Sequence, residues 1–131
     1  MIINKSNQTA INDLYIHDSI FENLIYEHEG RIVRIEVDNY QLKKHFSITF
    51  CNIIYMELTG AQFWGFGRMI FDWEVIINDE KLNELIGIQY SIADEASYFS
   101  SKITLNSGDT IKIICQEIIF DENTTLNILT T

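Results

Sequence analysis

Two acidic residues in one short segment have the spacing that acid–base chemistry needs. Asp72 and Glu74 lie two positions apart in a stretch of alternating apolar residues, so both carboxylates belong to the polar side of one predicted strand, together with Arg68. Neighbouring carboxylates of this kind are what many hydrolases use. Any solvated strand face shows the same pattern, and the sequence indicates no pocket around it. A hydrolase that uses Asp72 and Glu74 is therefore one hypothesis among several.

The histidines are the next candidates for chemistry. His17, Asp18 and Ser19 have the residue types of a catalytic relay, but consecutive residues point in different directions and cannot form a relay by themselves. We expect Asp18 and Ser19 to hydrogen-bond the backbone as a strand begins, with His17 packed beside them. His17, His28 and His45 lack the close spacing of metal ligands, so we expect no catalytic residue among them, no metal and no cofactor.

An aromatic, glycine-punctuated segment is the strongest candidate for a binding site. It covers residues 61–67 and is followed by Arg68. Aromatic and arginine side chains dominate the energetics of protein interfaces, and aromatic loops also stack on sugar rings. Alternatively, these rings cap the end of the core, and the sequence leaves both interpretations open. With the two carboxylates, the candidate binding residues are Phe63, Trp64, Phe66, Arg68, Asp72 and Glu74.

Strands must position these residues. Segments 45–58 and 69–77 both alternate between apolar and polar residues, which is the signature of strands with one buried face. Segment 45–58 is longer than most strands, so we expect it to bend near Cys51-Asn52, and residues 68–77 to pair back on it. The expected inward residues are Phe46, Ile48, Phe50, Ile54, Met56 and Leu58 in the first segment, and Met69, Phe71, Trp73, Val75 and Ile77 in the second.

Two hairpins flank this central pair. Residues 19–29 and 31–38 form one about Glu29-Gly30, and residues 102–106 and 110–120 form the other about Ser107-Gly108-Asp109.

Residues 78–87 are ambiguous. Asn78 or Asp79 is a suitable helix cap, but Ile86, Ile88 and further residues alternate as in a strand. We expect a short helical turn to about Asn83 and a strand from residue 84 or 85 onward.

The predicted fold is a single all-β domain over residues 1–131. It is an antiparallel sandwich or open barrel of about seven or eight strands with little helix. Residues 1–13 form a polar N-terminal arm with room for one helical turn, and residues 122–131 a C-terminal tail or edge strand. The chain has no proline to block pairing at the edges of its sheets, so edge strands of two copies can pair and form a homo-oligomer.

Composition narrows the class of partner. Nineteen acidic residues against nine basic ones give a formal charge of −10, which argues against nucleic acid and would attract a basic protein. The sequence has no apolar run of membrane-spanning length and no secretory signal, so we expect a cytoplasmic protein without a membrane partner. Cys51 and Cys115 fall in predicted strands and are interpreted as free core thiols, although a disulfide between them stays geometrically possible.

The order of motifs resembles a group of small bacterial β-proteins that begin with a His-Asp-Ser motif. The resemblance covers about residues 14–77 and rests on the segment Tyr15-Ile16-His17-Asp18-Ser19-Ile20 and, beyond a strand and a hairpin, on Trp64 followed by Ile70-Phe71-Asp72. Most members have no known function, and some are similar to immunity proteins of contact-dependent or secreted toxin systems. The resemblance implies a small acidic protein that blocks a toxin by binding it, and it transfers no catalytic residue.

Three functional hypotheses follow. The first is a non-enzymatic binding protein of the immunity or antitoxin type, with an acidic face that steers it to a basic protein and Trp64 as an anchor. The alternative is a small-ligand or carbohydrate-binding domain that uses Phe63, Trp64 and Tyr55. The second alternative is the hydrolase that uses Asp72 and Glu74.

Overall fold

The computed structural model describes residues 1–60, 68–89 and 97–123. Its strands are β1 (Ile2–Asn4), β2 (Ile20–Glu27), β3 (Ile32–Asn39), β4 (Lys44–Cys51), β5 (Tyr55–Thr59), β6 (Ile70–Ile76), β7 (Phe99–Leu105), β8 (Thr110–Cys115) and β9 (Glu117–Asn123). The helices of the described residues are the 3-10 helix η1 (Lys5–Asp13) and α1 (Glu80–Gln89). In this part of the chain no helix has both the length and the apolar character that crossing a membrane requires.

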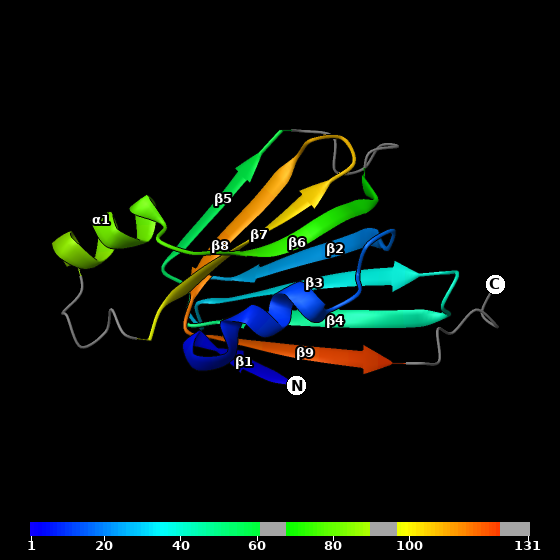
Figure 1. The fold of residues 1–131 in the computed structure, drawn as a ribbon, viewed down its shortest axis with the longest axis horizontal. Helices are drawn as coiled ribbons and strands as arrows, with labels where there is room; N and C mark the ends of the chain where they lie inside the picture. Colours follow the sequence, from blue (N-terminus) through cyan, green and yellow to red (C-terminus); the bar gives the residue numbers. More distant parts are fainter. Residues whose placement is uncertain (61–67, 90–96, 124–131) are drawn as a thin grey trace.

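The strands form two antiparallel sheets (Figure 1). A five-stranded sheet has the order β1-β9-β4-β3-β2, and a four-stranded sheet has the order β5-β8-β7-β6. The predicted all-β antiparallel fold is therefore confirmed, as an open sandwich rather than a closed barrel. The predicted hairpin about Glu29-Gly30 is present as β2–β3, and the one about Ser107-Gly108-Asp109 is present as β7–β8. Its second strand, predicted as 110–120, is divided at Gln116 into β8 and β9, which belong to different sheets.

A bent ribbon connects the two sheets. β4 pairs with β9 in the five-stranded sheet, and their neighbours along the chain, β5 and β8, pair with each other in the four-stranded sheet. The ribbon bends at Asn52, whose φ is 56°, and at Gln116, whose N–H donates to the Cys51 carbonyl oxygen at 3.2 Å. Such bends let strands pass from one sheet to the other at the corner of a sandwich. The predicted interruption near Cys51-Asn52 is confirmed, and it separates two strands in different sheets.

The sheets also meet where β2 begins. The Asp18 N–H donates to the Ile70 carbonyl oxygen at 2.8 Å, and the Ile70 N–H donates to the Ser19 carbonyl oxygen at 2.7 Å. Along the rest of its length β6 pairs with β7. The prediction that residues 68–77 pair with segment 45–58 is wrong, because β7 and β8 lie between β6 and β5.

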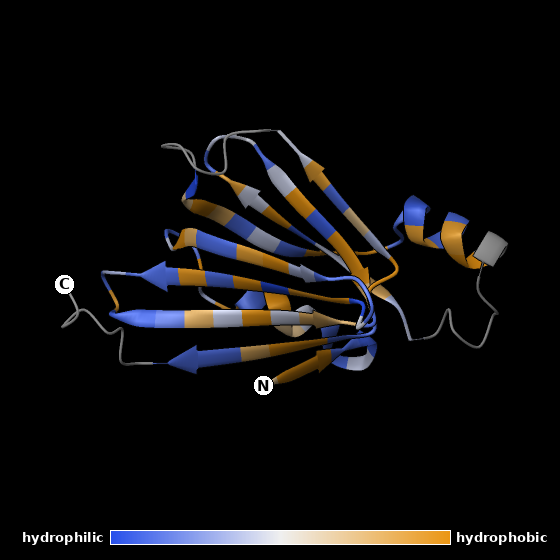
Figure 2. Ribbon diagram, turned by 180° about the vertical axis from the view of Figure 1, so that it is seen from behind, coloured by the Kyte–Doolittle hydropathy of each residue, from blue (hydrophilic) through white to orange (hydrophobic). Residues whose placement is uncertain are grey.

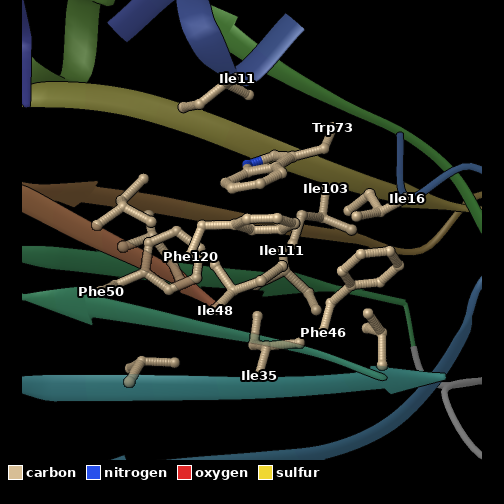
Figure 3. Close-up of a cluster of buried hydrophobic side chains, with 14 of the residues drawn as sticks. Ile11, Ile16, Ile35, Phe46, Ile48, Phe50, Trp73, Ile103, Ile111 and Phe120 are labelled. Carbon is tan, nitrogen blue, oxygen red and sulfur yellow. The ribbon is translucent and has the colours of Figure 1, made fainter. Parts of the chain in front are cut away.

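The core lies between the sheets. Trp73 packs its ring 6.2 Å from the ring of Phe50 and 6.1 Å from that of Phe120, and Phe120 stacks on Phe46 at 5.4 Å (Figure 3). The alternation of apolar and polar residues that predicted these strands is visible along both sheets in Figure 2. It places the side chains of Phe46, Ile48 and Phe50 in the interior, as predicted.

Three residues predicted to point inward are exposed instead. Phe71 is 56% exposed, because the register of β6 shifts between Ile70 and Asp72 and the bulge turns Ile70 into the core. Leu58 is 47% exposed because β5 is an edge strand. Ile77 is exposed just beyond the end of β6.

The ambiguous segment is a helix. Asp79 caps α1 by accepting from the Lys81 N–H at 3.1 Å through its side chain. Leu82 and Ile86 of α1 are buried against Ile114 and Tyr98 on the outer side of the four-stranded sheet. The predicted strand from residue 84 onward is therefore wrong. Leu82 and Ile86 are four residues apart, so a helix places both side chains on one face and buries both against the sheet.

The N-terminal segment is part of the sandwich rather than an arm. β1 pairs with β9, and the Asn4 side chain caps η1 by accepting from the Ser6 N–H at 2.9 Å. Ile3 and Ile11 are both fully buried in the main core. Two isoleucines among polar residues were too few to show a period in the sequence. At the other end, β9 extends to Asn123, and residues 124–131 lie outside the described residues.

Candidate functional site

The aromatic segment does not enter the structural description. Phe63, Trp64 and Phe66 lie outside the described residues, and Arg68 is half-buried at the border. Whether the rings cap the core or bind a partner stays a prediction.

Asp72 and Glu74 lie on the outer face of the four-stranded sheet, where a row of charges crosses all its strands. Glu74 is opposite Lys102, Lys102 is opposite Lys112, and Lys112 is opposite Glu57. The Lys102 Nζ is 3.7 Å from Glu74 Oε1. Asp72 is exposed opposite a threonine of β7. The two carboxylates thus share a face, as predicted, but Glu74 is paired in a solvated charge ladder.

His17, Asp18 and Ser19 have the structural role that was predicted. Asp18 adopts φ 68° and joins β2 to β6 through the backbone bonds described above. The His17 Nδ1 is 2.5 Å from the Phe71 carbonyl oxygen, and its ring meets the Phe71 ring edge-on at 5.9 Å. Ser19 is buried, with its hydroxyl oxygen 3.4 Å from the Asn39 amide nitrogen. These contacts fix the sheet junction.

The five-stranded sheet presents an acidic outer face. The register places Asp38 opposite His45, and Glu36 opposite Ser47, which in turn is opposite Asp121. We call these five residues, on β3, β4 and β9, the acidic face. Among the described helices, η1 contributes Ile11 to the core side, and α1 packs on the other sheet. The acidic face is therefore uncovered in the described part of the chain.

His45 bridges two carboxylates at the centre of the acidic face. Its Nδ1 is 2.6 Å from Asp38 Oδ1 and its Nε2 is 2.5 Å from Glu36 Oε2. Partial burial of the ring disfavours the charged form, but the hydrogen bonds to Asp38 and Glu36 outweigh it and raise the pKa of His45 above its ordinary value. Both ring nitrogens donate only in the imidazolium form. The two carboxylates therefore keep His45 protonated at pH values above the ordinary pKa of a histidine side chain.

Two more side chains hold Glu36 in place. The Ser47 hydroxyl donates to Glu36 Oε1 at 3.1 Å, and the Arg34 Nε is 3.2 Å from the same oxygen. Sequence analysis missed this cluster, although a signal exists. In a hairpin of β3 and β4, positions whose numbers sum to 83 are opposite each other, which pairs Asp38 with His45 and Glu36 with Ser47. Both pairs fall on the polar side of their strands.

A cleft lies beside the bend of the ribbon. It has a volume of about 400 Å³ and is lined by Tyr26, His28, Arg31, Ile53, Ile54, Tyr55 and Met56. Of the three residues proposed for carbohydrate binding, only Tyr55 is described, and it belongs to this cleft. Its hydroxyl donates to Glu57 at 2.7 Å, and this bond, with partial burial, raises the pKa of the Tyr55 phenol. We call this the bend cleft.

The thiols and the acidic clusters offer no further reactive centre within the described residues. Cys51 and Cys115 are both free, and burial raises the pKa of the Cys115 thiol far above its ordinary value. A thiol held in that state is a poor nucleophile. No group of three or more histidine, cysteine, aspartate or glutamate side chains in the described ranges has the geometry to hold a metal ion.

Comparison with known proteins adds the fold alone. No family model and no curated protein sequence matches the chain. A solved structure titled as an uncharacterized protein from Neisseria gonorrhoeae is similar, with a TM-score of 0.53 and 17% sequence identity. The match covers 92% of this chain and 97% of that one. Nearly the whole length therefore shares one architecture with that protein, at an identity that transfers no site.

Proposed function

We propose that the protein is a non-enzymatic binding protein of the immunity type, which binds a basic protein through the acidic face. The observation that supports the proposal most is the position of three carboxylates on the uncovered outer face of the sheet, with Glu36 and Asp38 on β3 and Asp121 on β9, the two strands that flank β4. Strands hold these carboxylates at fixed spacing, so a complementary row of lysine or arginine side chains meets them with little loss of entropy.

Charge favours the same class of partner. A formal charge of −10 raises the rate at which a basic protein arrives, and its contribution falls as salt screens it. The proposal includes a cytoplasmic location, and Trp64 as an apolar anchor for the partner. The proposed function requires no catalytic group. Glu74, one of the two carboxylates considered for catalysis, is paired with Lys102.

The experiment uses the product of the neighbouring gene as the candidate partner. Calorimetric titration with the full chain should give a complex that weakens as salt rises from low concentration to about 0.15 M. The triple variant Glu36→Gln, Asp38→Asn, Asp121→Asn should weaken binding by roughly one hundredfold, because three charge contacts at an interface are lost.

A matched triple variant controls for net charge. Glu57→Gln, Asp72→Asn and Glu74→Gln remove the same charge from the outer face of the other sheet. This variant should bind within a fewfold of the wild type. Equal losses in the two variants, or an absence of binding to the neighbouring product at low salt, would remove the proposal. Hydrolysis that disappears in Asp72→Asn would replace it with the enzymatic alternative.

A further inference from the structure

The bend cleft contrasts in charge with the rest of the molecule. The chain has about two acidic residues for each basic one, yet the residues that line the cleft include an arginine and a histidine and no acidic residue. A second cation is close by, because the Lys81 Nζ lies 5.0 Å from the centre of the Tyr55 ring. The Lys81 Nζ is also 3.8 Å from Glu84 Oε2, and the Tyr55 hydroxyl donates to Glu57, so the positive charge that the cleft itself offers is that of Arg31.

Arg31 is held rigidly at the cleft. Its Nε donates to the Ile53 carbonyl oxygen at 3.0 Å, and its own carbonyl oxygen accepts from the Ile53 N–H at 3.0 Å. Its Nη2 is 3.5 Å from the hydroxyl of the buried Tyr98. These bonds fix the guanidinium and leave Nη1 for another acceptor. A guanidinium fixed in advance loses little entropy when it binds an anion.

The backbone of Arg31 is strained. Its φ is 54°, in the left-handed region that is unfavourable for a residue with a side chain. Glycine precedes it, so the turn has a residue suited to this conformation one position earlier. Strain of this kind is retained where the surrounding contacts impose it, and it concentrates at binding sites.

The other lining residues include a polar pair, Tyr26 and His28, and three apolar residues, Ile53, Ile54 and Met56. The Tyr26 hydroxyl is 3.0 Å from the His28 Nδ1, which leaves the His28 Nε2 outside this bond. Ile53 is buried, and Ile54 and Met56 are partly buried, so all three present apolar surface beside the charged group. A volume of about 400 Å³ is near the lower end of the range for small-molecule sites, about 300–1,000 Å³.

We propose that the bend cleft binds a small organic carboxylate, with the carboxylate on Arg31 and the apolar body on Ile53, Ile54 and Met56. The site is separate from the acidic face and does not depend on the proposed function. Its ligand has one negative charge and a body of a few carbon atoms or one ring. A neutral sugar can accept a hydrogen bond from Arg31 but forms no ion pair with it, which distinguishes this class from a carbohydrate.

The test uses 4-phenylbutyrate and its neutral isostere 4-phenylbutanamide as probes. Each is titrated into the isotopically labelled chain of residues 1–131, and amide shifts are followed by NMR. The acid should cause saturable shifts at Ile53, Ile54 and Met56, and should bind at least about tenfold more tightly than the amide, since the amide keeps one acceptor oxygen but loses the ion pair with the guanidinium. Equal affinities for acid and amide, shifts located elsewhere, or no saturable shift up to the solubility limit would overturn the proposal.

Two arginine variants separate the site from general charge. Arg31→Gln should weaken binding of 4-phenylbutyrate by about tenfold, whereas Arg34→Gln on the acidic side of the molecule should change it less than about twofold. Equal effects of the two variants would count against the site. If thermal unfolding shows that Arg31→Gln does not fold, the comparison of acid and amide on the wild type decides the question alone.

Discussion

The Nδ1 atom of His45 lies 2.6 Å from Oδ1 of Asp38, across the β3–β4 pair. The other ring nitrogen meets Glu36, so one imidazolium separates two carboxylates that would otherwise repel each other on the outer face of the sheet. On the β9 side, the neighbours of this row are Asn123 opposite His45 and Asp121 opposite Ser47. The positive charge is thus surrounded by acceptors and acids, and its loss leaves Asp38 without this cationic partner, while Glu36 keeps its contact with Arg34.

His45 makes stability depend on pH in a defined direction. Because its pKa is raised in the folded state, the charged ring contributes stability that is complete below the unfolded pKa of about 6.5 and is lost as the pH rises through the folded value. Denaturant unfolding of the wild type and of His45→Gln should therefore differ most at acidic pH, and the difference should shrink as the pH rises. In Asp38→Asn the NMR titration of His45 should move to lower pH. A difference that grows with pH would contradict the assignment.

The alternation of apolar and polar residues was sufficient to predict the strands but not which strands pair with each other. Segment 45–58 shows strict alternation on both sides of Asn52, so the sequence indicates the strands and the interruption between them. It gives no sign that β5 belongs to the second sheet, because that depends on β8 being its partner. Pairing between distant strands is a property of the whole chain, and local pattern carries little information about it.

The candidate sites were predicted less well for a related reason. Asp72 and Glu74 were found because they are neighbours in sequence, whereas the acidic face joins three strands and becomes visible only through register. The bend cleft is harder still, since Arg31 and Ile53 meet only after the ribbon has bent. Sequence analysis finds sites whose residues are neighbours in sequence. The acidic face and the bend cleft are each formed by residues from separate segments of the chain.

The ion pair between Asp79 and Lys112 fixes α1 to the four-stranded sheet. The Lys112 Nζ is 2.8 Å from Asp79 Oδ1, and only 5% of the Asp79 side chain is exposed. Burial alone would raise the pKa of Asp79, but the Lys112 bond and the Lys81 N–H lower it below its ordinary value. The Ser100 hydroxyl adds to this effect, although its geometry falls short of a hydrogen bond. The carboxylate is therefore stabilised as an anion, and this contribution is lost as the pH falls through its lowered pKa.

We predict that Asp79→Asn, which keeps a capping oxygen but removes the charge, lowers the free energy of unfolding by about 3 kcal/mol, because Lys112 loses its partner in a partly buried site. Lys112→Met should cost as much. The double variant should recover most of the loss, since no unpaired charge remains. Urea unfolding of the four proteins measures this cycle, and additive losses in the double variant would show that the pair does not act as a unit.

The N-terminal segment should behave as part of the core. Ile11 is fully buried beside Trp73, whereas Thr9 on the same 3-10 helix is exposed (Figure 3). Ile11→Ala should lower the free energy of unfolding by roughly 2–5 kcal/mol through lost burial and the cavity left behind. Thr9→Ala should change it by less than about 0.5 kcal/mol, as exposed substitutions do. Equal, small effects in thermal and denaturant unfolding would restore the idea of a loose arm.

Gly60 and Gly108 form a matched pair for separating backbone strain from steric overlap. Their φ angles are 94° and 92°, so alanine is strained at either position. A Cβ on Gly60 would lie 1.5 Å from Asp109 Oδ1 and 2.4 Å from its Cγ, whereas a Cβ on Gly108 meets nothing within 4 Å. The end of β5 therefore approaches the β7–β8 turn as closely as glycine permits.

Gly108→Ala should cost roughly 1–2 kcal/mol of unfolding free energy, from the left-handed backbone alone. Gly60→Ala should cost about 1–3 kcal/mol more, because the buried Asp109 side chain must move or the strand must shift. In a double-mutant cycle, Asp109→Ala should lower the free energy of unfolding less in the Gly60→Ala background than in the wild type, since it removes the overlapping atoms. Equal costs for the two glycine variants in denaturant unfolding would mean that the chain relaxes around residue 60, and that the close approach of β5 to Asp109 does not constrain the fold.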